Sequence, residues 1–429
     1  MDILLAIAKW LSDNIFGQAA ILIGLVALVG LLLQGKSFSQ VVAGTGKTIL
    51  GFVIIGAGAG VVVNALFSFG PLWNQVFGIT AQKATGMGTA KFIEQFGGTI
   101  TLIMTFGFLI NVLLARFTRF KYIYLTGHMM FWVSFVLVAI FYETLPGMSR
   151  TAMVVAGSII MGVYWTLQPA LTQRYMRMIT DTDEIALGHT TGVGAFLAGW
   201  LGKYVGNPKQ STEDIKVPEW LEFVKDSNIS IALVMVLAYV VGALLAGREF
   251  VNQASQGKMN HIIWAIMQGV TFAAGVAIIL LGVRMLIAEI VPAFRGIATR
   301  IVPNAKPALD CPVVYPYAPT AVIVGFLSCF VVVVIAMFIM GVAKWYVLVP
   351  AMIPIFFHGG TSGVFGNATG GVRGAILGGI IDGIILSVGQ AVVATQLART
   401  VQDFILWGGD TDMFFWGGPL YALLKLFGN

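Results

Sequence analysis

Residues 303–326 read PNAKPALDCPVVYPYAPTAVIVGF, and this stretch constrains the fold more than any other. Prolines interrupt it at five positions between long apolar segments. Each proline removes a backbone donor and clashes with the preceding turn, so no continuous helix can form there. Irregular backbone at membrane depth is tolerated only inside protein or beside a wet cavity. Asp310, within this stretch, is therefore a candidate site residue; a solvated aspartate on a surface loop is the plainer alternative.

The composition places this stretch in a membrane protein. Of 429 residues, 58% are hydrophobic and 10% are charged, and the mean hydropathy is +0.89. Soluble domains carry about 25% charged residues. A span needs about 20 apolar residues, so the length allows roughly ten to twelve helices or half-helices and no separate soluble domain. We predict an all-α integral membrane protein that forms one polytopic domain over residues 1–429.

Several function classes are not supported by the residues. Cys311 and Cys329 both lie in apolar surroundings, where cysteine usually behaves as a small hydrophobe, so neither a disulfide nor a metal cluster is expected. Residues 44–48, GTGKT, imitate a phosphate-binding loop, but Val41 stands where that loop requires a glycine. No serine, cysteine or carboxylate pair forms a hydrolytic set. We expect no catalytic residue, no cofactor and no metal.

The net charge of +6 comes from basic residues at helix ends, which indicate how the protein is oriented in the membrane rather than nucleic-acid binding. Four connections, residues 36–47, 116–121, 171–184 and 284–306, hold 11 of the 25 lysines and arginines. Basic residues favour the cytoplasmic side of a membrane. We therefore expect these connections in the cytoplasm and the amino terminus outside.

Identical residues at a constant spacing suggest an internal repeat. Three pairs of identical residues lie 223 positions apart: Lys83 and Lys306, Lys121 and Lys344, and Leu125 and Leu348. The shifted segments have opposite predicted orientations, which is typical of inverted repeats with a site between them. We predict approximate repeats over residues 15–205 and 229–398; chance alignment of lysines at helix ends is the competing explanation.

Three polar residues stand within apolar or re-entrant segments: His128, His189 and Asp310. Together they offer hydrogen-bond donors and acceptors, as a polyol or a mildly acidic sugar requires. A buried hydroxyl without a partner costs about 1–3 kcal/mol. A single histidine of this kind more often caps a helix or pairs with a carbonyl, and that structural interpretation stands beside the functional one.

Other side chains are secondary candidates. His358, in FFHGGTSG, has a setting similar to that of His128 and His189. Tyr315, Tyr317 and Trp132 could stack on a sugar ring, although aromatic residues in membrane helices more often pack or anchor at the interface.

Six sequence elements, in order, resemble the membrane component (IIC) of the ascorbate family of the sugar phosphotransferase system. They are GFVIIGAGAG (51–60), LTGHMMF (125–131), IALGHTTG (185–192), GVRMLIAE (282–289), ALDCPVVYPYAPTAVIVGF (308–326) and IPIFFHGGTSGVF (353–365). Each is weak alone, but six in order across nearly the whole chain are specific.

The resemblance implies a bacterial inner-membrane permease. It implies a homodimer of protomers with about eleven transmembrane segments, re-entrant hairpins and inverted repeats, divided into a substrate-holding core and a dimerisation domain that move like an elevator. A phosphocysteine on a separate IIB protein, recharged by IIA, would phosphorylate the sugar. We expect no IIA or IIB domain and no phosphorylated residue in this chain.

The resemblance also implies ligand positions. By motif they fall on His128, His189 and Asp310, on the backbone of Gly86, Met87 and Gly88, and on Trp132 and Thr190. At three positions this chain departs from the ascorbate members: Trp132 and Thr190 replace glutamines, and Met87 replaces a tyrosine. The substrate therefore stays open among ascorbate, a related sugar acid and a pentitol. The rival hypothesis is an ion-coupled secondary transporter in which Asp310 and Asp382 carry protons or sodium.

Overall fold

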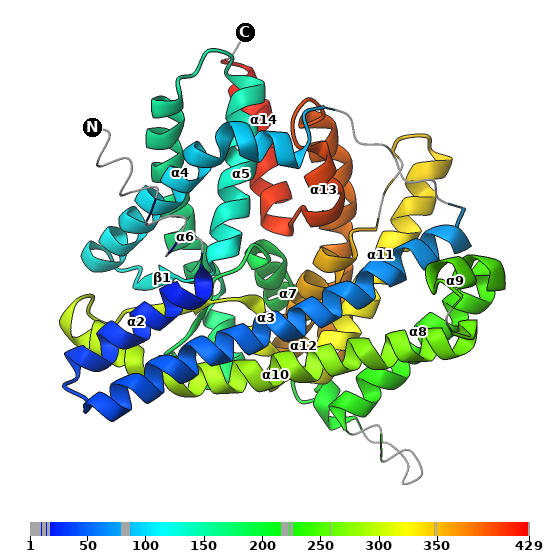
Figure 1. Cartoon of the computed structure of the whole chain (residues 1–429), viewed down its shortest axis with the longest axis horizontal. Helices are drawn as coiled ribbons and strands as arrows, with labels where there is room; N and C mark the ends of the chain where they lie inside the picture. The colour runs from blue at the N-terminus through cyan, green and yellow to red at the C-terminus, as the bar shows by residue number, and fades with distance from the viewer. Residues whose placement is uncertain are drawn as a thin grey trace.

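The structure is a computed structural model. It describes residues 18–78, 86–215, 226–257 and 259–427, apart from Val347 and Val349, together with Trp10, Asn14 and Phe223. Most of the described chain is helical (Figure 1). Lys83, on which part of the repeat argument depends, lies outside the described residues.

Long apolar helices dominate the described chain. They are α2 Ala19–Leu33, α3 Phe38–Val76, α4 Thr89–Phe117, α5 Gly127–Thr144, α6 Arg150–Thr180, α7 Gly192–Val205, α8 Ser227–Ala246, α9 Arg248–Ala254, α10 His261–Arg300, α11 Pro319–Val342, α12 Met352–Gln396, α13 Gln402–Gly408 and α14 Thr411–Lys425, with the 3-10 helices η2 Thr212–Asp214 and η4 Cys311–Tyr317. Among the described residues, seven helices are long and apolar enough to span a membrane, or eight if a bent pair near Gly247 counts as one. The predicted helical membrane protein is confirmed; the count of about eleven segments is not established by these helices.

One of these helices is in fact a hairpin. Gly371 breaks α12 with φ +59°, a left-handed backbone conformation that favours glycine. A side chain added at Gly366 would collide with the backbone of Gly374, and one added at Gly378 would collide with that of Ser362. The two halves of α12 therefore lie antiparallel and in backbone contact, which only small residues permit.

The two longest unbroken helices of the described chain, α3 and α10, pack along each other. α3 and α10 have 39 and 40 residues, so each is about 59 Å long, against about 30 Å for the bilayer core. They run side by side (Figure 1), with Gly51 packed on the backbone of Leu286 and Gly58 on that of Ile279. These contacts make the pair antiparallel, and its length requires a strong tilt or ends that extend beyond the bilayer.

The chain also forms a small parallel sheet, which the all-α prediction did not include. Its strands are β1 Tyr122–Tyr124, β2 Ala186–Leu187 and β3 Lys306–Leu309, in the order β1-β3-β2. Tyr122 pairs with Lys306, and Ala186 pairs with Ala308. The chain that follows the connection at residues 116–121 therefore begins as a strand before it enters α5. Strands of two to four residues are too short to produce a recognisable hydrophobic period.

Most of the connection predicted at residues 36–47 is helical. Helix α3 begins at Phe38, because Ser37 and Gln40 form a reciprocal capping box that satisfies its first backbone donors.

Ion pairs join the basic connections to one another. The pairs are Lys47–Glu289 (3.1 Å), Arg177–Asp183 (3.1 Å), Arg295–Glu184 (2.6 Å) and Lys306–Asp183 (2.5 Å). The backbone of Lys306 also donates to the carbonyl of Lys121. Burial acts to raise the pKa of Asp183, but hydrogen bonds from Lys306 and Gln173 outweigh it and hold that pKa below its ordinary value. The four connections predicted to share one side of the membrane are therefore joined at one end of the molecule.

Candidate functional site

The three polar residues singled out in the sequence come directly after the three parallel strands. Asp310 follows β3, His189 lies two residues after β2, and His128 lies four residues after β1. Parallel strands end at the same edge of a sheet, so side chains just beyond their carboxyl ends converge. The sheet thus explains how residues far apart in the chain meet.

These residues form what we call the open triad: His128, His189 and Asp310. The Nε2 atom of His128 lies 3.5 Å from one carboxylate oxygen of Asp310, and that of His189 lies 3.6 Å from the other. Both distances exceed the usual range for N–H···O hydrogen bonds, about 2.7–3.2 Å. The structure thus brings the three residues together, and the facing atoms of the triad are left without short hydrogen bonds to one another.

Burial differs across the open triad. The side chain of His128 is 45% exposed, that of Asp310 is 21% exposed and that of His189 is 4% exposed. The second ring nitrogen of His189, Nδ1, is buried and has no hydrogen-bond partner within the described part of the chain. One oxygen of Asp310 accepts a hydrogen bond from the backbone N–H of Cys311 at 2.7 Å, which fixes the carboxylate at the start of η4. The triad therefore has a fixed carboxylate and spare hydrogen-bonding capacity.

A cavity of about 300 Å³ opens onto the open triad. That volume is at the lower end of the range for small-molecule sites, about 300–1,000 Å³. One wall is apolar and comes from α3, through Phe52, Ile55, Gly56, Ala59 and Val63. A cavity with one apolar wall and a few convergent polar groups is typical of a binding site for a small solute.

Aromatic rings form another part of the wall. Trp132, on α5, stacks on Phe404 of α13 with ring centroids 4.5 Å apart and an angle of 18° between planes. Trp407 meets Trp132 edge-on at 5.8 Å. All three residues line the cavity. Trp132 therefore lines the same cavity as the open triad.

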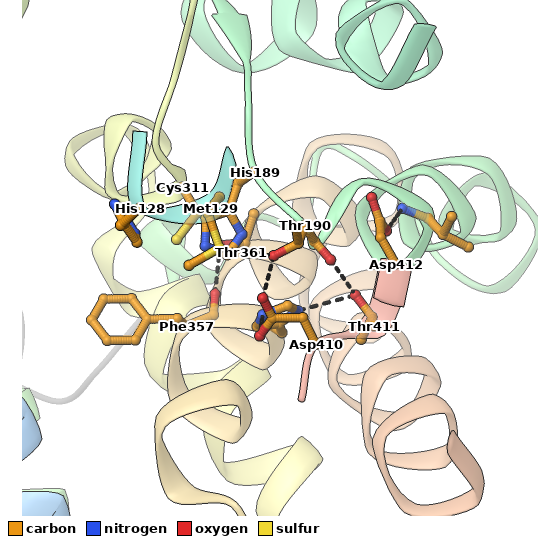
Figure 2. A network of polar contacts seen from close by, with 12 residues as sticks. His128, Met129, His189, Thr190, Cys311, Phe357, Thr361, Asp410, Thr411 and Asp412 are labelled. Atoms are coloured by element: carbon orange, nitrogen blue, oxygen red, sulfur yellow. Dashed lines mark hydrogen bonds and ion pairs between the residues drawn. The ribbon is translucent and has the colours of Figure 1, made fainter. Parts of the chain in front are cut away.

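A second polar group lies beside the open triad, and we call it the closed cluster: Thr190, His358, Asp410 and Thr411. His358 Nε2 lies 2.9 Å from a carboxylate oxygen of Asp410, and its Nδ1 lies 3.0 Å from the hydroxyl of Thr411. The hydroxyl of Thr190 donates to the other oxygen of Asp410, and the carbonyl of Thr190 accepts from the Thr411 hydroxyl (Figure 2). All four residues are buried.

The closed cluster joins two loops. Besides accepting from Thr411, the carbonyl of Thr190 accepts from the backbone N–H of Asp412 at 2.9 Å, and the carboxylate of Asp412 accepts from the N–H of Val193 at 2.7 Å. These bonds tie the start of α7 to the start of α14. The hydroxyl of Thr190 is thereby engaged within the protein, and Thr190 does not line the cavity.

The predicted backbone loop of Gly86, Met87 and Gly88 lies elsewhere. The N–H of Met87 donates to the carbonyl of Arg399 at 3.1 Å, and that of Gly88 donates to the carbonyl of Thr400 at 2.8 Å. The loop does not line the cavity, because it packs against the turn between α12 and α13. The structure therefore does not bring this loop to the open triad.

Of the secondary candidates His358, Tyr315 and Tyr317, one lines the cavity and two do not. His358 lines the cavity. Tyr315 is buried and donates to the carbonyl of Phe357 at 3.1 Å, and Tyr317 is 38% exposed; neither lines the cavity. Of these three residues, the structure brings only His358 to the open triad, with its ring centroid 5.1 Å from that of His189.

The open triad could also hold a metal ion. Its ligand atoms all lie within 4.8 Å of one another. Two histidines and a carboxylate suit a divalent transition ion. The expectation of no metal considered only the cysteines. The same three groups suit the hydroxyls of a solute, so the triad alone does not identify its ligand.

Sequence reasoning missed the contribution of the carboxyl-terminal region. Asp410, Thr411, Phe404 and Trp407 all lie beyond residue 398, where the second predicted repeat ended. A signal was present: residues 407–412 read WGGDTD, in which two acids follow a glycine pair between apolar runs. Acidic residues between apolar segments are candidate site residues for the same reason as Asp310.

Comparisons with known proteins bear on the whole chain. The sequence model of the family described as "PTS system sugar-specific permease component" matches residues 14–413. The "Ascorbate-specific PTS system EIIC component" of Mycoplasma pneumoniae (strain ATCC 29342 / M129 / Subtype 1) is 28% identical to this chain, and the match covers 83% of this chain and 62% of that protein. The chain thus spans less than two thirds of the length of this curated relative.

Proposed function

The chain belongs to the family of sugar-specific permease components of the phosphotransferase system, and from that premise we propose that it binds a sugar acid at the open triad and delivers it for phosphorylation. A separate phosphocysteine IIB protein supplies the phosphoryl group. The observation that carries this proposal is the convergence of His128, His189 and Asp310 on one cavity.

The chemistry of the cavity supports a hydroxylated solute. Asp310 would accept hydrogen bonds from two neighbouring hydroxyls, while His128 and His189 would bind ring or enol oxygens. Trp132 offers an aromatic face beside them. Hydrogen bonds to a charged group contribute about 1.5–3 kcal/mol each, so two bonds to Asp310 would dominate the affinity.

The positions of the three departing residues support an ascorbate-like substrate. Of the three positions at which the chain departs from ascorbate members, only Trp132 lines the cavity. The hydroxyl of Thr190 is bonded to Asp410, and Met87 lies against Arg399. We therefore propose an ascorbate-like sugar acid as the substrate, with Trp132 as the departure most able to alter the choice.

An internal repeat is supported by the helix bounds. Adding 223 to the bounds of α3 gives 261–299, and α10 is His261–Arg300. The same shift takes α4 to 312–340, near α11 Pro319–Val342, and α7 to 415–428, near α14 Thr411–Lys425. We propose that these are inverted repeats over approximately residues 15–205 and 229–398, and that α14 extends the second one.

The arrangement around the cavity supports an elevator-type mechanism. One wall belongs to α3, which packs along α10, while the open triad belongs to the segments that begin beyond the sheet. A site between two helix groups can pass from one side of the membrane to the other if one group slides along the other. We propose that α3 and α10 belong to the static, dimerisation part and that the triad belongs to the moving core.

Partner proteins enter as part of the same proposal. Both cysteines are buried, which supports a phosphoryl carrier on another protein. We propose a homodimer in the bacterial inner membrane that works with cytoplasmic IIB and IIA proteins.

Uptake into vesicles tests the proposal. The purified protein is reconstituted into vesicles with and without phosphorylated IIA and IIB proteins inside, and labelled sugar acids are added outside. We expect phosphorylated product only when the donors are present. Uptake of unmodified sugar that depends on a proton or sodium gradient would instead support the ion-coupled transporter. A thermal-shift screen of ascorbate, other sugar acids and pentitols selects the substrate for this assay.

A further inference from the structure

A second cavity, away from the open triad, lies between α4 and α6. It has a volume of about 670 Å³ and an apolar lining. Its main lining residues are Leu102, Phe106, Ile110, Val154, Val155 and Ile159. Phe106 is 40% exposed and Val155 is 56% exposed, so the groove opens toward the outside of the chain.

A polar recess adjoins one end of this groove. Its volume is about 390 Å³, and its lining includes Gln95, Tyr142, Gly147, Arg150 and Arg399. Arg150 lines both the recess and the apolar groove, so the two spaces meet at its side chain. The molecule therefore presents a long apolar groove that ends at a recess with two arginines.

Charge and helix geometry favour an anion in the recess. Arg150 is the first residue of α6, and the amino-terminal N–H groups of a helix attract negative charge. The guanidinium of Arg399 donates to Glu143 at 2.9 Å, which holds it in place while its side chain stays 72% exposed. Arginine binds phosphate oxygens through several parallel donors.

The length of the groove matches one leaflet of a membrane. The lining residues on α6 run from Arg150 to Ile159, which is about 13 Å at 1.5 Å per residue. One leaflet contributes about 15 Å of hydrocarbon, half of the bilayer core. Because α6 is a candidate membrane span, a charged end and an apolar tail of this length can lie along it together.

We propose that the groove and the recess together bind one anionic phospholipid. Its phosphate lies beside Arg150 and Arg399, and one acyl chain lies in the groove.

Native mass spectrometry of the full chain in a non-ionic detergent tests this proposal. Phosphatidylglycerol and phosphatidylcholine with the same acyl chains are titrated separately, and inorganic phosphate is added as a competitor. We expect one phosphatidylglycerol per chain, bound at least tenfold more tightly than phosphatidylcholine. Inorganic phosphate should not displace it, because phosphate alone makes no contact with the groove.

Two variants separate the two halves of the site. Arg150→Gln should remove the preference for phosphatidylglycerol, while Val155→Trp should fill the groove and weaken binding of both lipids at least tenfold. The matched controls are Arg119→Gln and Leu109→Trp, which change an exposed arginine and an exposed leucine that line neither space. Both controls should bind lipid as the natural chain does.

Three results would overturn the proposal. Equal retention of both lipids by the natural chain would show that the recess does not recognise an anionic headgroup. Displacement by inorganic phosphate would reduce it to a simple anion site. A shift from dimer to monomer in Val155→Trp, with lipid binding unchanged, would identify the groove as a contact between two copies of the chain.

Discussion

The open triad and the closed cluster are neighbours of similar composition, yet their hydrogen bonding is opposite. The rings of His189 and His358 are 5.1 Å apart. In the closed cluster, both ring nitrogens of His358 have partners, at 2.9 and 3.0 Å. In the open triad, the histidine nitrogens approach Asp310 only to 3.5 and 3.6 Å.

We propose that this difference separates a ligand-binding group, the open triad, from a supporting group, the closed cluster. Buried polar groups normally find hydrogen-bond partners, because an unsatisfied one costs free energy. The closed cluster is already satisfied and ties the loop before α7 to the loop before α14. The open triad faces the cavity and has hydrogen-bonding groups that are not fully used within the described part of the chain. A solute that bonds to the triad can therefore supply the missing partners.

The largest expected effect is the loss of sugar binding in Asp310→Ala. This change removes two hydrogen bonds to a charged group, about 3–6 kcal/mol in total, so affinity should fall at least 100-fold. Isothermal titration calorimetry on the purified protein measures it. Asp310→Asn is the matched variant: it keeps the shape and the cap on η4 and should lose less. Binding of unchanged affinity by Asp310→Ala would refute the role of the open triad.

The second expected effect falls on stability. Asp410→Ala leaves His358 buried without its carboxylate, and breaking a buried pair costs about 3–5 kcal/mol. Thermal melting in detergent should show a clear fall in the midpoint, while the protein that stays folded keeps sugar affinity within about tenfold. Normal melting together with lost binding would show that the closed cluster is itself a ligand site.

A smaller effect is expected at the aromatic wall. Trp132→Leu removes stacking on Phe404 and on a sugar ring, and aromatic pairs are worth about 0.5–1.5 kcal/mol. Affinity should fall about three- to tenfold. Of the three positions at which the sequence was expected to differ from ascorbate members, only Trp132 lines the cavity. Trp132→Gln should therefore shift the preference among sugar acids in the same calorimetric assay. An identical substrate profile in Trp132→Gln would remove this residue from the specificity argument.

The smallest effect is expected at Met87. Its backbone is bonded to Arg399 and it does not line the cavity, so Met87→Ala should change sugar affinity less than twofold. A tenfold loss would show that the loop of Gly86, Met87 and Gly88 reaches the sugar in another conformation.

The membrane class and the residues of the open triad could be predicted from the sequence. Charged or polar residues inside apolar segments are costly, and Asp310, His128 and His189 stand out for that reason. What brings them together could not be predicted, because β2 has only two residues and its pairing with β3 joins segments more than a hundred residues apart. Asp410 was missed because its segment is short and less apolar, so attention to long apolar runs excluded it.

The most direct test uses the small number of histidines. The chain has four, at positions 128, 189, 261 and 358, so ¹⁵N-histidine NMR of the protein gives few signals, which single His→Gln variants assign. On addition of the sugar acid, the signals of His128 and His189 should shift strongly, while those of His358 and His261 stay near their original positions. Saturating sugar that leaves His128 and His189 unmoved would contradict the account.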